Sequence, residues 1–266
     1  MHAASRLALG MILTLAPVAE AIDISSCDSE VPAGQIGVLT GDLDCSWDVE
    51  EGSYGVELGR NATLDMQGHT ITGPQWAVSC PGPGGKCTVT STTGTPGTLI
   101  GAEAGIWSPT SKVVASHVQI ITNAYGISNN PKTTLADVTF MDNGFALTAR
   151  SLKATDVTVT GHCDRGYCMD LGKGTIDGLV TADTGESATV LQVSGKMKVS
   201  NATMSGSPGQ VAIFAAGIRI TNSEVHGHGI DLAARSLRVQ NVTCDHSRRF
   251  GKDGFVIGNW GVCAGD

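Results

Sequence analysis

Ile218-Arg-Ile-Thr-Asn-Ser-Glu-Val225 and Leu237-Arg-Val-Gln-Asn-Val-Thr-Cys244 are two copies of one short pattern. In each copy apolar and polar residues alternate, an asparagine stands at the fifth position, and a second alternating stretch follows it. Such alternation is typical of β-strands with one buried face. A Gly-led third stretch ends each unit, as in Gly229-Ile-Asp-Leu232 and Gly254-Phe-Val-Ile257. Three short strands per unit are what one coil of a β-helix requires.

The pattern recurs through residues 111–258 with steps of 19 to 23 residues. A period near twenty residues is typical of a solenoid. A leucine-rich horseshoe has a similar period, but its Leu-x-x-Leu-x-Leu frame is absent. The repeat therefore predicts an all-β fold, a single-stranded right-handed parallel β-helix of about 8–10 coils. The aligned units begin at Val113, Thr133, Leu152, Thr175, Met197, Ile218 and Leu237.

A polar residue stands between the first two strands of most units. Asn and Asp tolerate the left-handed backbone that a sharp turn between strands needs. Stacked in successive coils, these side chains can also share hydrogen bonds. We therefore interpret them as turn residues and not as a cluster of catalytic carboxylates. The set consists of Asp137, Asp156, Asn201, Asn222 and Asn241.

The chain divides by composition into four parts. Residues 1–21 have an apolar run and a small-residue cleavage site, which predict a signal peptide. We expect residues 22–60 to form an N-terminal cap and the first strands, residues 61–258 the coils, and residues 259–266 a short C-terminal cap. The leading apolar run is too short to span a bilayer, so we expect no transmembrane segment. These features predict a secreted protein, extracellular or periplasmic.

Eight cysteines are consistent with an oxidising compartment, where disulfides persist. Sequence alone allows 105 complete pairings, and local spacing favours one of them. In that pairing the N-terminal cap is stapled by a disulfide. No cysteine spacing typical of zinc occurs, so we expect no metal site of that kind. The favoured pairs are Cys27–Cys45, Cys80–Cys87, Cys163–Cys168 and Cys244–Cys263.

Leu64-Asp-Met-Gln-Gly-His-Thr-Ile-Thr-Gly73, after Leu39-Thr-Gly-Asp-Leu-Asp-Cys45, resembles the opening coil of secreted right-handed parallel β-helix proteins of the pectate-lyase-like superfamily. With the later coils, the resemblance covers nearly the whole mature chain. It implies the fold and leaves the activity open. Many relatives bind, cleave or epimerise polysaccharides, and the lyases among them use basic residues, often with Ca2+. Gly227-His228-Gly229 resembles the Gly-His-Gly element of polygalacturonases, but the rest of that pattern is absent.

Carboxylate catalysis can be tested by position. We expect Ala146, Asp170, Asp231 and Val256 to face outward on the third strands. Coils stack about 4.8 Å apart, so Asp170 and Asp231, three coils apart, are expected roughly 14 Å from each other. A glycosidase pair needs about 5–9.5 Å. The alignment therefore argues against these two residues as such a pair.

Basic residues are more suggestive. Lys198, Arg219 and Arg238 occupy the same outward position in three consecutive coils, and Lys153 has this position two coils before Lys198. Like charges on neighbouring strands repel, so an anion is expected over them, either acidic side chains or a ligand. One interpretation is a solvated face whose charges confer solubility. The other is a ligand-binding groove for an acidic glycan, with the arginines making bidentate carboxylate contacts.

The loops carry a second polar group, which includes Asp164 and Arg165. His228 and His246 fall at nearly the same phase of adjacent coils, where one metal or one substrate could contact both. Two histidines without a clear third ligand are a weak metal signal, so we assign no metal, and Ca2+ stays open from the resemblance alone. The catalytic candidates, all weak, are Arg248, Arg249, Lys252, His228 and His246.

Three functions remain open. The first is binding, with or without cleavage, of an acidic polysaccharide; an enzyme of this kind would be a polysaccharide lyase or a related carbohydrate-active enzyme. The second is a non-catalytic surface or matrix scaffold, in which a thinly capped last coil pairs with another chain. The third is an inactive relative of a polysaccharide enzyme. A net charge of −8 argues against a nucleic-acid partner, and we expect a monomer.

Overall fold

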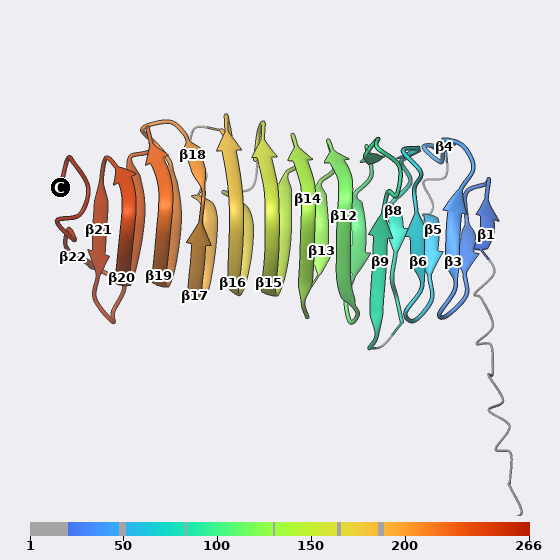
Figure 1. Cartoon of the computed structure of the whole chain (residues 1–266), viewed down its shortest axis with the longest axis horizontal. Coiled ribbons are helices and arrows are strands. Elements are labelled where there is room, and N and C mark those ends of the chain that lie inside the picture. Colours follow the sequence, from blue (N-terminus) through green and yellow to red (C-terminus); the bar gives the residue numbers. More distant parts are fainter. Residues whose placement is uncertain (1–20, 48–51, 83, 130, 164–165, 186–188) are drawn as a thin grey trace, which may run out of the picture.

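A computed structural model describes residues 21–47, 52–82, 84–129, 131–163, 166–185 and 189–266. The expected signal peptide, apart from Ala21, lies outside these residues, as do Asp164 and Arg165. The described residues contain no α-helix and form one sheet of 22 strands, wound into an elongated solenoid of about nine turns (Figure 1). The predicted fold class and number of coils are therefore confirmed.

The strands are short in the N-terminal coils, and from β12 onward many of them continue through the corners of a coil. Their bounds are β1 Ala21–Ile24, β2 Ser29–Val31, β3 Ile36–Leu39, β4 Leu43–Asp44, β5 Tyr54–Leu58, β6 Thr63–Asp65, β7 Thr70–Thr72, β8 Trp76–Ser79, β9 Lys86–Thr90, β10 Gly97–Ile100, β11 Ala104–Ser108, β12 Lys112–Ile121, β13 Tyr125–Asn129, β14 Thr133–Met141, β15 Phe145–Thr160, β16 Tyr167–Ala182, β17 Thr189–Ser200, β18 Thr203–Ser205, β19 Val211–His226, β20 Ile230–Cys244, β21 Ser247–Phe250 and β22 Val256–Gly258.

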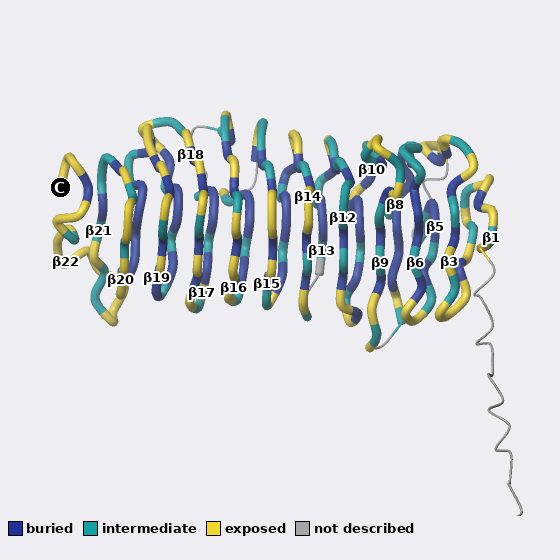
Figure 2. Tube along the Cα trace, viewed as in Figure 1, coloured by how far each residue is buried: buried dark blue, intermediate teal, exposed yellow. Residues whose placement is uncertain are grey.

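The core is a column of apolar side chains inside the coils. Buried and more exposed residues alternate along most of the strands, and Figure 2 shows the buried segments recurring from coil to coil. Parallel pairing puts equivalent residues over one another, so that Val118 lies beside Val138 and Val138 beside Val157. Phe140 is the largest fully buried side chain. Because a single coil cannot bury its apolar side chains alone, each coil depends on its neighbours for stability.

The polar residues predicted at the first corner adopt the left-handed backbone. The φ angles of Asp137, Asp156, Asn201, Asn222 and Asn241 lie between 50° and 54°. Asn241 donates a side-chain hydrogen bond of 3.1 Å to the Oδ1 of Asn222 in the preceding coil. Both parts of the turn interpretation are therefore confirmed.

The predicted alignment was wrong by one residue in β16. Leu152 pairs with Gly174, and Gly174 with Met197, so the unit begins at Gly174 and not at Thr175. The register between β16 and β17 is irregular from Leu171 to Gly174. A glycine has no side chain to mark the inward face, so alternation along this segment could not reveal its place.

The predicted third strands were partly wrong as well. Ala146 and Asp231 do not face outward but are buried, with exposed fractions of 1% and 0%. The third strand of the last coil is β21, whereas Val256 lies in β22, which pairs with β21 in the antiparallel direction. A turn at Gly251–Gly254, closed by a hydrogen bond from the Gly254 N–H to the Gly251 carbonyl (3.2 Å), reverses the chain.

All four predicted disulfides are present: Cys27–Cys45, Cys80–Cys87, Cys163–Cys168 and Cys244–Cys263. The first two lie in the N-terminal coils, where β1 already pairs in parallel with β3, and β2 with β5. The fourth fastens the C-terminal segment to the last coil. The described residues contain no helix that could span a lipid bilayer.

Candidate functional site

The register brings the predicted cations into one line. Lys198 pairs with Arg219, and Arg219 with Arg238, across three consecutive coils. Lys153 stands in the same column two coils earlier, with Thr175 between it and Lys198. All four cations are exposed, and each alternates with less exposed neighbours, such as the buried Met197 and Ile218. The four side chains therefore form a line parallel to the solenoid axis.

A second column of lysines lies two residues upstream, and sequence reasoning missed it. Lys86 pairs with Lys112, and Lys132 directly precedes Thr133, the partner of Val113. Lys173 pairs with Ser151, and Lys196 with Gly217. The available signal was a lysine just before the first strand of many units, but an alignment that begins at residue 111 omits the coil of Lys86.

Together the two columns place at least one cation on each of eight consecutive coils, those of β9, β12, β14, β15, β16, β17, β19 and β20. At about 4.8 Å per coil this row is roughly 34 Å long. It contains nine of the 17 Lys and Arg residues of the chain. We call it the basic row: Lys86, Lys112, Lys132, Lys153, Lys173, Lys196, Lys198, Arg219 and Arg238.

Apart from Lys132, the cations of the basic row are not paired with acidic side chains of the described residues. The ion pairs found among the described residues join His to Asp. Asp177, on the same strand as Lys173, instead accepts hydrogen bonds from Ser200 Oγ (2.8 Å) and Asn201 Nδ2 (2.6 Å). Among the described residues, acidic side chains therefore form no ion pair with Lys198, Arg219 or Arg238, although Asp177 lies in the neighbouring column beside Ser200.

The C-terminal part of the basic row borders a hollow of about 360 Å³. Lys198, Arg219 and Arg238 line it together with Lys196 and Ser236. Beside these cations, two residues further along each strand, runs a neutral polar column of Ser200, Thr221 and Gln240. The site therefore offers point charges next to hydroxyl and amide groups, a combination that suits an anionic ligand rich in hydroxyls.

The catalytic candidates Arg248, Arg249 and Lys252 lie elsewhere. Arg248 and Arg249 are in β21, on the third strand of the last coil, and Lys252 is in the turn that follows. Arg248 is half-buried and donates from Nη1 to the Ser247 carbonyl (3.1 Å). The Arg249 guanidinium lies over the Trp260 ring, 5.1 Å from its centroid. The structure does not place these residues on the strand that carries the basic row.

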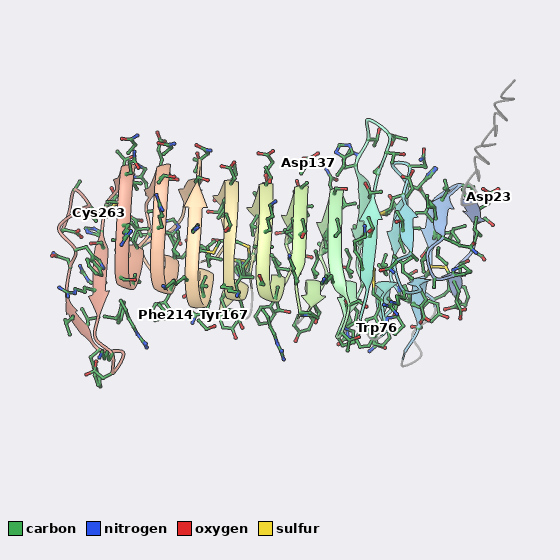
Figure 3. The ribbon with its side chains drawn as sticks, turned by 60° about the horizontal axis from the view of Figure 1, so that its bottom comes forward. Asp23, Trp76, Asp137, Tyr167, Phe214 and Cys263 are labelled. Atoms are coloured by element: carbon green, nitrogen blue, oxygen red, sulfur yellow. A yellow bond between two sulfur atoms is a disulfide. The ribbon has the colours of Figure 1, made fainter. Side chains whose placement is uncertain are left out.

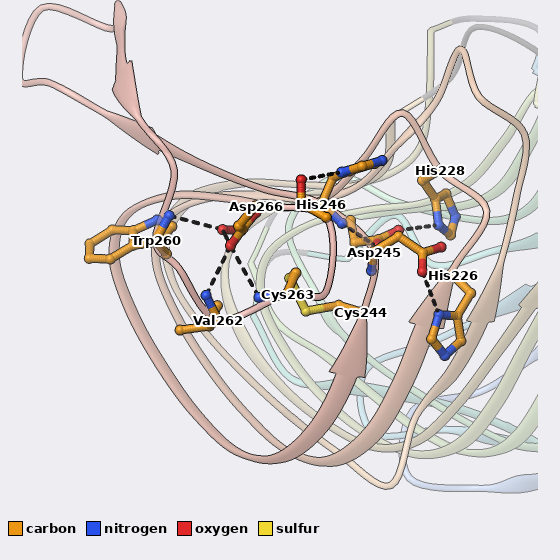
Figure 4. Close-up of a disulfide and its surroundings, with 12 residues drawn as sticks. His226, His228, Cys244, Asp245, His246, Trp260, Val262, Cys263 and Asp266 are labelled. Carbon is orange, nitrogen blue, oxygen red and sulfur yellow. Dashed lines mark hydrogen bonds and ion pairs between the residues drawn. A yellow bond between two sulfur atoms is a disulfide. The ribbon is translucent and has the colours of Figure 1, made fainter.

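His228 and His246 have separate partners (Figure 4). The His228 side chain is fully buried, and its Nδ1 lies 3.1 Å from Asp231 Oδ1. The Asp231 carboxylate also accepts hydrogen bonds from the backbone N–H groups of Asp245 and His246. The His246 ring instead contacts the Gly265 carbonyl, with 3.2 Å between Nδ1 and the oxygen. Within the residues that the structure describes, no three His, Cys, Asp or Glu side chains form a group that could hold a metal ion.

Two carboxylates near this end have lowered pKa values. Two hydrogen bonds to the Asp245 carboxylate hold its pKa below the usual value. The one from the Gly227 N–H has the larger effect, and the one from the His226 side chain has the next largest. Burial alone would raise the pKa of Asp266, but hydrogen bonds from Ser247 and from the backbone of Cys263 and Val262 outweigh burial and lower it to about 2. The contacts of Asp266 with Ser247 hold the C-terminal segment against the last coil.

Aromatic side chains collect on the third strands, a feature that sequence reasoning did not identify. Tyr125 and Phe145 stack with centroids 5.3 Å apart, and Trp76 and Trp107 stack at 4.1 Å. Figure 3 shows Trp76 and Tyr167 along one border of the solenoid. Since these rings cover the faces of one another, we interpret them as stabilising contacts between coils.

Comparisons with protein-family models, with curated proteins and with solved structures found no match. Membership of the pectate-lyase-like superfamily therefore stays a prediction. The functional proposal rests on the geometry and charge of the basic row.

Proposed function

We propose that this chain is a secreted protein, related to the pectate-lyase-like superfamily, whose basic row binds a linear acidic polysaccharide along the solenoid axis. The observation that supports it most is the basic row itself, with at least one exposed cation on each of eight consecutive coils. Such a row repels itself and gains most from a ligand that brings an anion to every coil.

A polysaccharide fits this row better than other polyanions. Neighbouring cations are one coil apart, about 4.8 Å, similar to the length of one sugar unit in an extended chain. Arg219 and Arg238 can each bind a carboxylate through two parallel hydrogen bonds. A duplex nucleic acid needs a broad basic footprint, whereas this protein combines one narrow row with a net charge of −8.

Two features support secretion. Four disulfides persist in an oxidising compartment and are rare in the cytosol. The sequence of residues 1–21 also has the apolar run and cleavage site of a signal peptide. Acidic polysaccharides are polymers that such a protein meets outside the cell.

A binding assay tests the proposal. The mature protein is titrated with polygalacturonate, alginate and neutral dextran at low and high salt. We expect salt-sensitive binding to an acidic polymer and none to dextran. In the triple variant Lys198→Gln, Arg219→Gln, Arg238→Gln, affinity for the acidic polymer should fall roughly 10²-fold. Each substitution removes a charge contact worth up to about 1 kcal/mol.

The matched control neutralises three exposed arginines outside the basic row, Arg60, Arg150 and Arg235. It makes the same change in net charge but leaves the basic row intact, so its affinity should stay within a fewfold of wild type. Equal losses in both triple variants would show that net charge alone governs binding, and failure of the wild-type protein to bind any acidic polymer would reject the proposal.

The same preparations test catalysis. Each polymer is incubated with the protein, with and without calcium, and released fragments are analysed by mass spectrometry. Fragments with an unsaturated end would establish a lyase and direct the search for its base to the basic row and to Arg248, Arg249 and Lys252. Binding without release would indicate a glycan-binding protein.

A further inference from the structure

The turn after the last coil exposes an apolar tip. Phe255, Val256 and Ile257 are consecutive and have exposed fractions of 73%, 54% and 59%. Figure 3 shows the loop between β21 and β22 at the C-terminal end of the solenoid, where it extends beyond the turns of the neighbouring coils. Contiguous exposed apolar side chains mark interaction sites more often than scattered ones do.

The tip is held in place by hydrogen bonds, so its exposure is part of the fold. The Gly251 N–H donates to the Phe255 carbonyl (2.9 Å), and the Phe255 N–H donates to Asp253 Oδ1 (3.3 Å). Behind the turn, Trp260 Nε1 donates to the Arg248 carbonyl (3.1 Å). The three apolar side chains are therefore presented by an ordered hairpin.

Cations flank this tip in the sequence. Residues 247–258 contain three of them, Arg248, Arg249 and Lys252, and one acid, Asp253, whereas Asp266 accepts hydrogen bonds from Ser247 at the base of the hairpin. Arg249 and Lys252 are exposed, and Arg249 lies over the Trp260 ring. An apolar tip with flanking cations and a nearby tryptophan matches the chemistry of an anionic membrane surface.

We propose that the β21–β22 hairpin docks the protein on an anionic lipid bilayer. Phe255, Val256 and Ile257 enter the boundary between headgroups and acyl chains, and Arg249 and Lys252 contact the anionic headgroups. A second protein is a poorer occupant, because a stable protein interface buries about 800 Å² on each partner and three side chains fall short of that. Interfacial insertion needs only a short apolar element and basic flanks.

This inference is independent of glycan binding. The hairpin belongs to the third strand of the last coil, whereas the basic row follows the first strands. Docking through the tip leaves the basic row available to a polymer. Variants of the basic row should therefore keep vesicle binding, and variants of the tip should keep glycan binding.

Co-sedimentation with lipid vesicles tests the proposal. The full mature protein is mixed with vesicles of phosphatidylcholine alone or with 30% phosphatidylserine, a composition chosen for the assay to mimic an anionic leaflet. We expect binding to the anionic vesicles that weakens with salt. The variant Phe255→Ser, Val256→Ser, Ile257→Ser should reduce the partition coefficient at least tenfold. Arg249→Gln with Lys252→Gln should reduce it roughly 25-fold, about fivefold per charge.

The control is Met141→Ser with Val180→Ser, two exposed apolar residues outside the hairpin, with exposed fractions of 39% and 44%. It should bind vesicles like the wild-type protein, and circular dichroism verifies that each variant is folded. No binding of the wild-type protein to anionic vesicles, or equal binding by the tip variant, would overturn the proposal. Concentration-dependent dimerisation that the tip variant abolishes, without vesicle binding, would also overturn it and assign the tip to a second copy.

Discussion

Arg219 lies between two like charges, and this position predicts the effect of Arg219→Gln. Lys198 precedes it and Arg238 follows it in the paired register. Two unit charges about 4.8 Å apart in water repel by about 0.9 kcal/mol. A screening length of about 8 Å at physiological salt roughly halves this repulsion. Two neighbours then cost about 1 kcal/mol, an upper value because long side chains diverge.

Neutralising Arg219 should therefore stabilise the free protein and weaken its complex. We expect the free energy of unfolding to rise by about 0.5–1 kcal/mol near 0.15 M salt. Urea unfolding followed by circular dichroism measures it. At 1 M salt, where the screening length is about 3 Å, the gain should fall to about a third of that value. Affinity for the acidic polysaccharide should fall about fivefold in the same variant, since one charge contact is lost.

Arg235→Gln is the matched control. Arg235 is an exposed arginine next to the basic row, in a hollow that it lines with Ala216 and Phe250 instead of with cations. Its neutralisation should change neither the free energy of unfolding nor the affinity by more than a few tenths of a kcal/mol. The reasoning is refuted if Arg219→Gln destabilises the free protein at low salt, or if its effect on stability is the same at 1 M salt.

Three further outcomes concern stability. Phe140→Ala should lower the free energy of unfolding in urea by about 3–5 kcal/mol, since it opens a cavity in a fully buried site; a loss under 1 kcal/mol would contradict the packed core. Replacing Cys244 and Cys263 by Ser should cost about 3 kcal/mol in thermal unfolding, because their disulfide closes a loop with a sequence separation of 19; an unchanged Tm would argue against this role. The pKa of Asp266 lies below its unfolded value, so its stabilising contacts are fully present above about pH 4 and are lost as pH falls towards 2. Pepsin should then cleave within residues 259–266 first, and Asp266→Asn should weaken the pH dependence; equal cleavage at pH 2 and pH 4 in the wild-type protein would contradict this account.

Much of the fold could be predicted because a coil repeats its contacts. Alternating burial, a left-handed corner at residues such as Asn222 and Asn241, and local cysteine spacing are all expressed within some twenty residues. Prediction failed where the local pattern is silent. Gly174 has no side chain to show its face, and Asp231 is polar yet buried, because two backbone N–H groups and His228 satisfy its carboxylate.

The candidate site was predicted in part for a related reason. Lys198, Arg219 and Arg238 fall in units of nearly equal length, so counting aligned them. Lys86 and Lys112 are 26 residues apart yet adjacent across the coils, and no fixed period reveals that. The pairing of strands decides which distant residues become neighbours.

The amino-acid sequence by itself determined that this chain forms β-coils, where the coils turn, and which cysteines pair. These properties depend on interactions within one coil or between adjacent coils of regular length. Only the tertiary structure decided that two columns of cations merge into one basic row, that His228 is buried against Asp231, and that the last hairpin exposes Phe255. The first depends on the register between coils of unequal length, which backbone hydrogen bonds and packing set together for the whole stack. The other two depend on local three-dimensional contacts, the backbone N–H groups that satisfy Asp231 and the antiparallel pairing of β22 with β21, which alternation does not express.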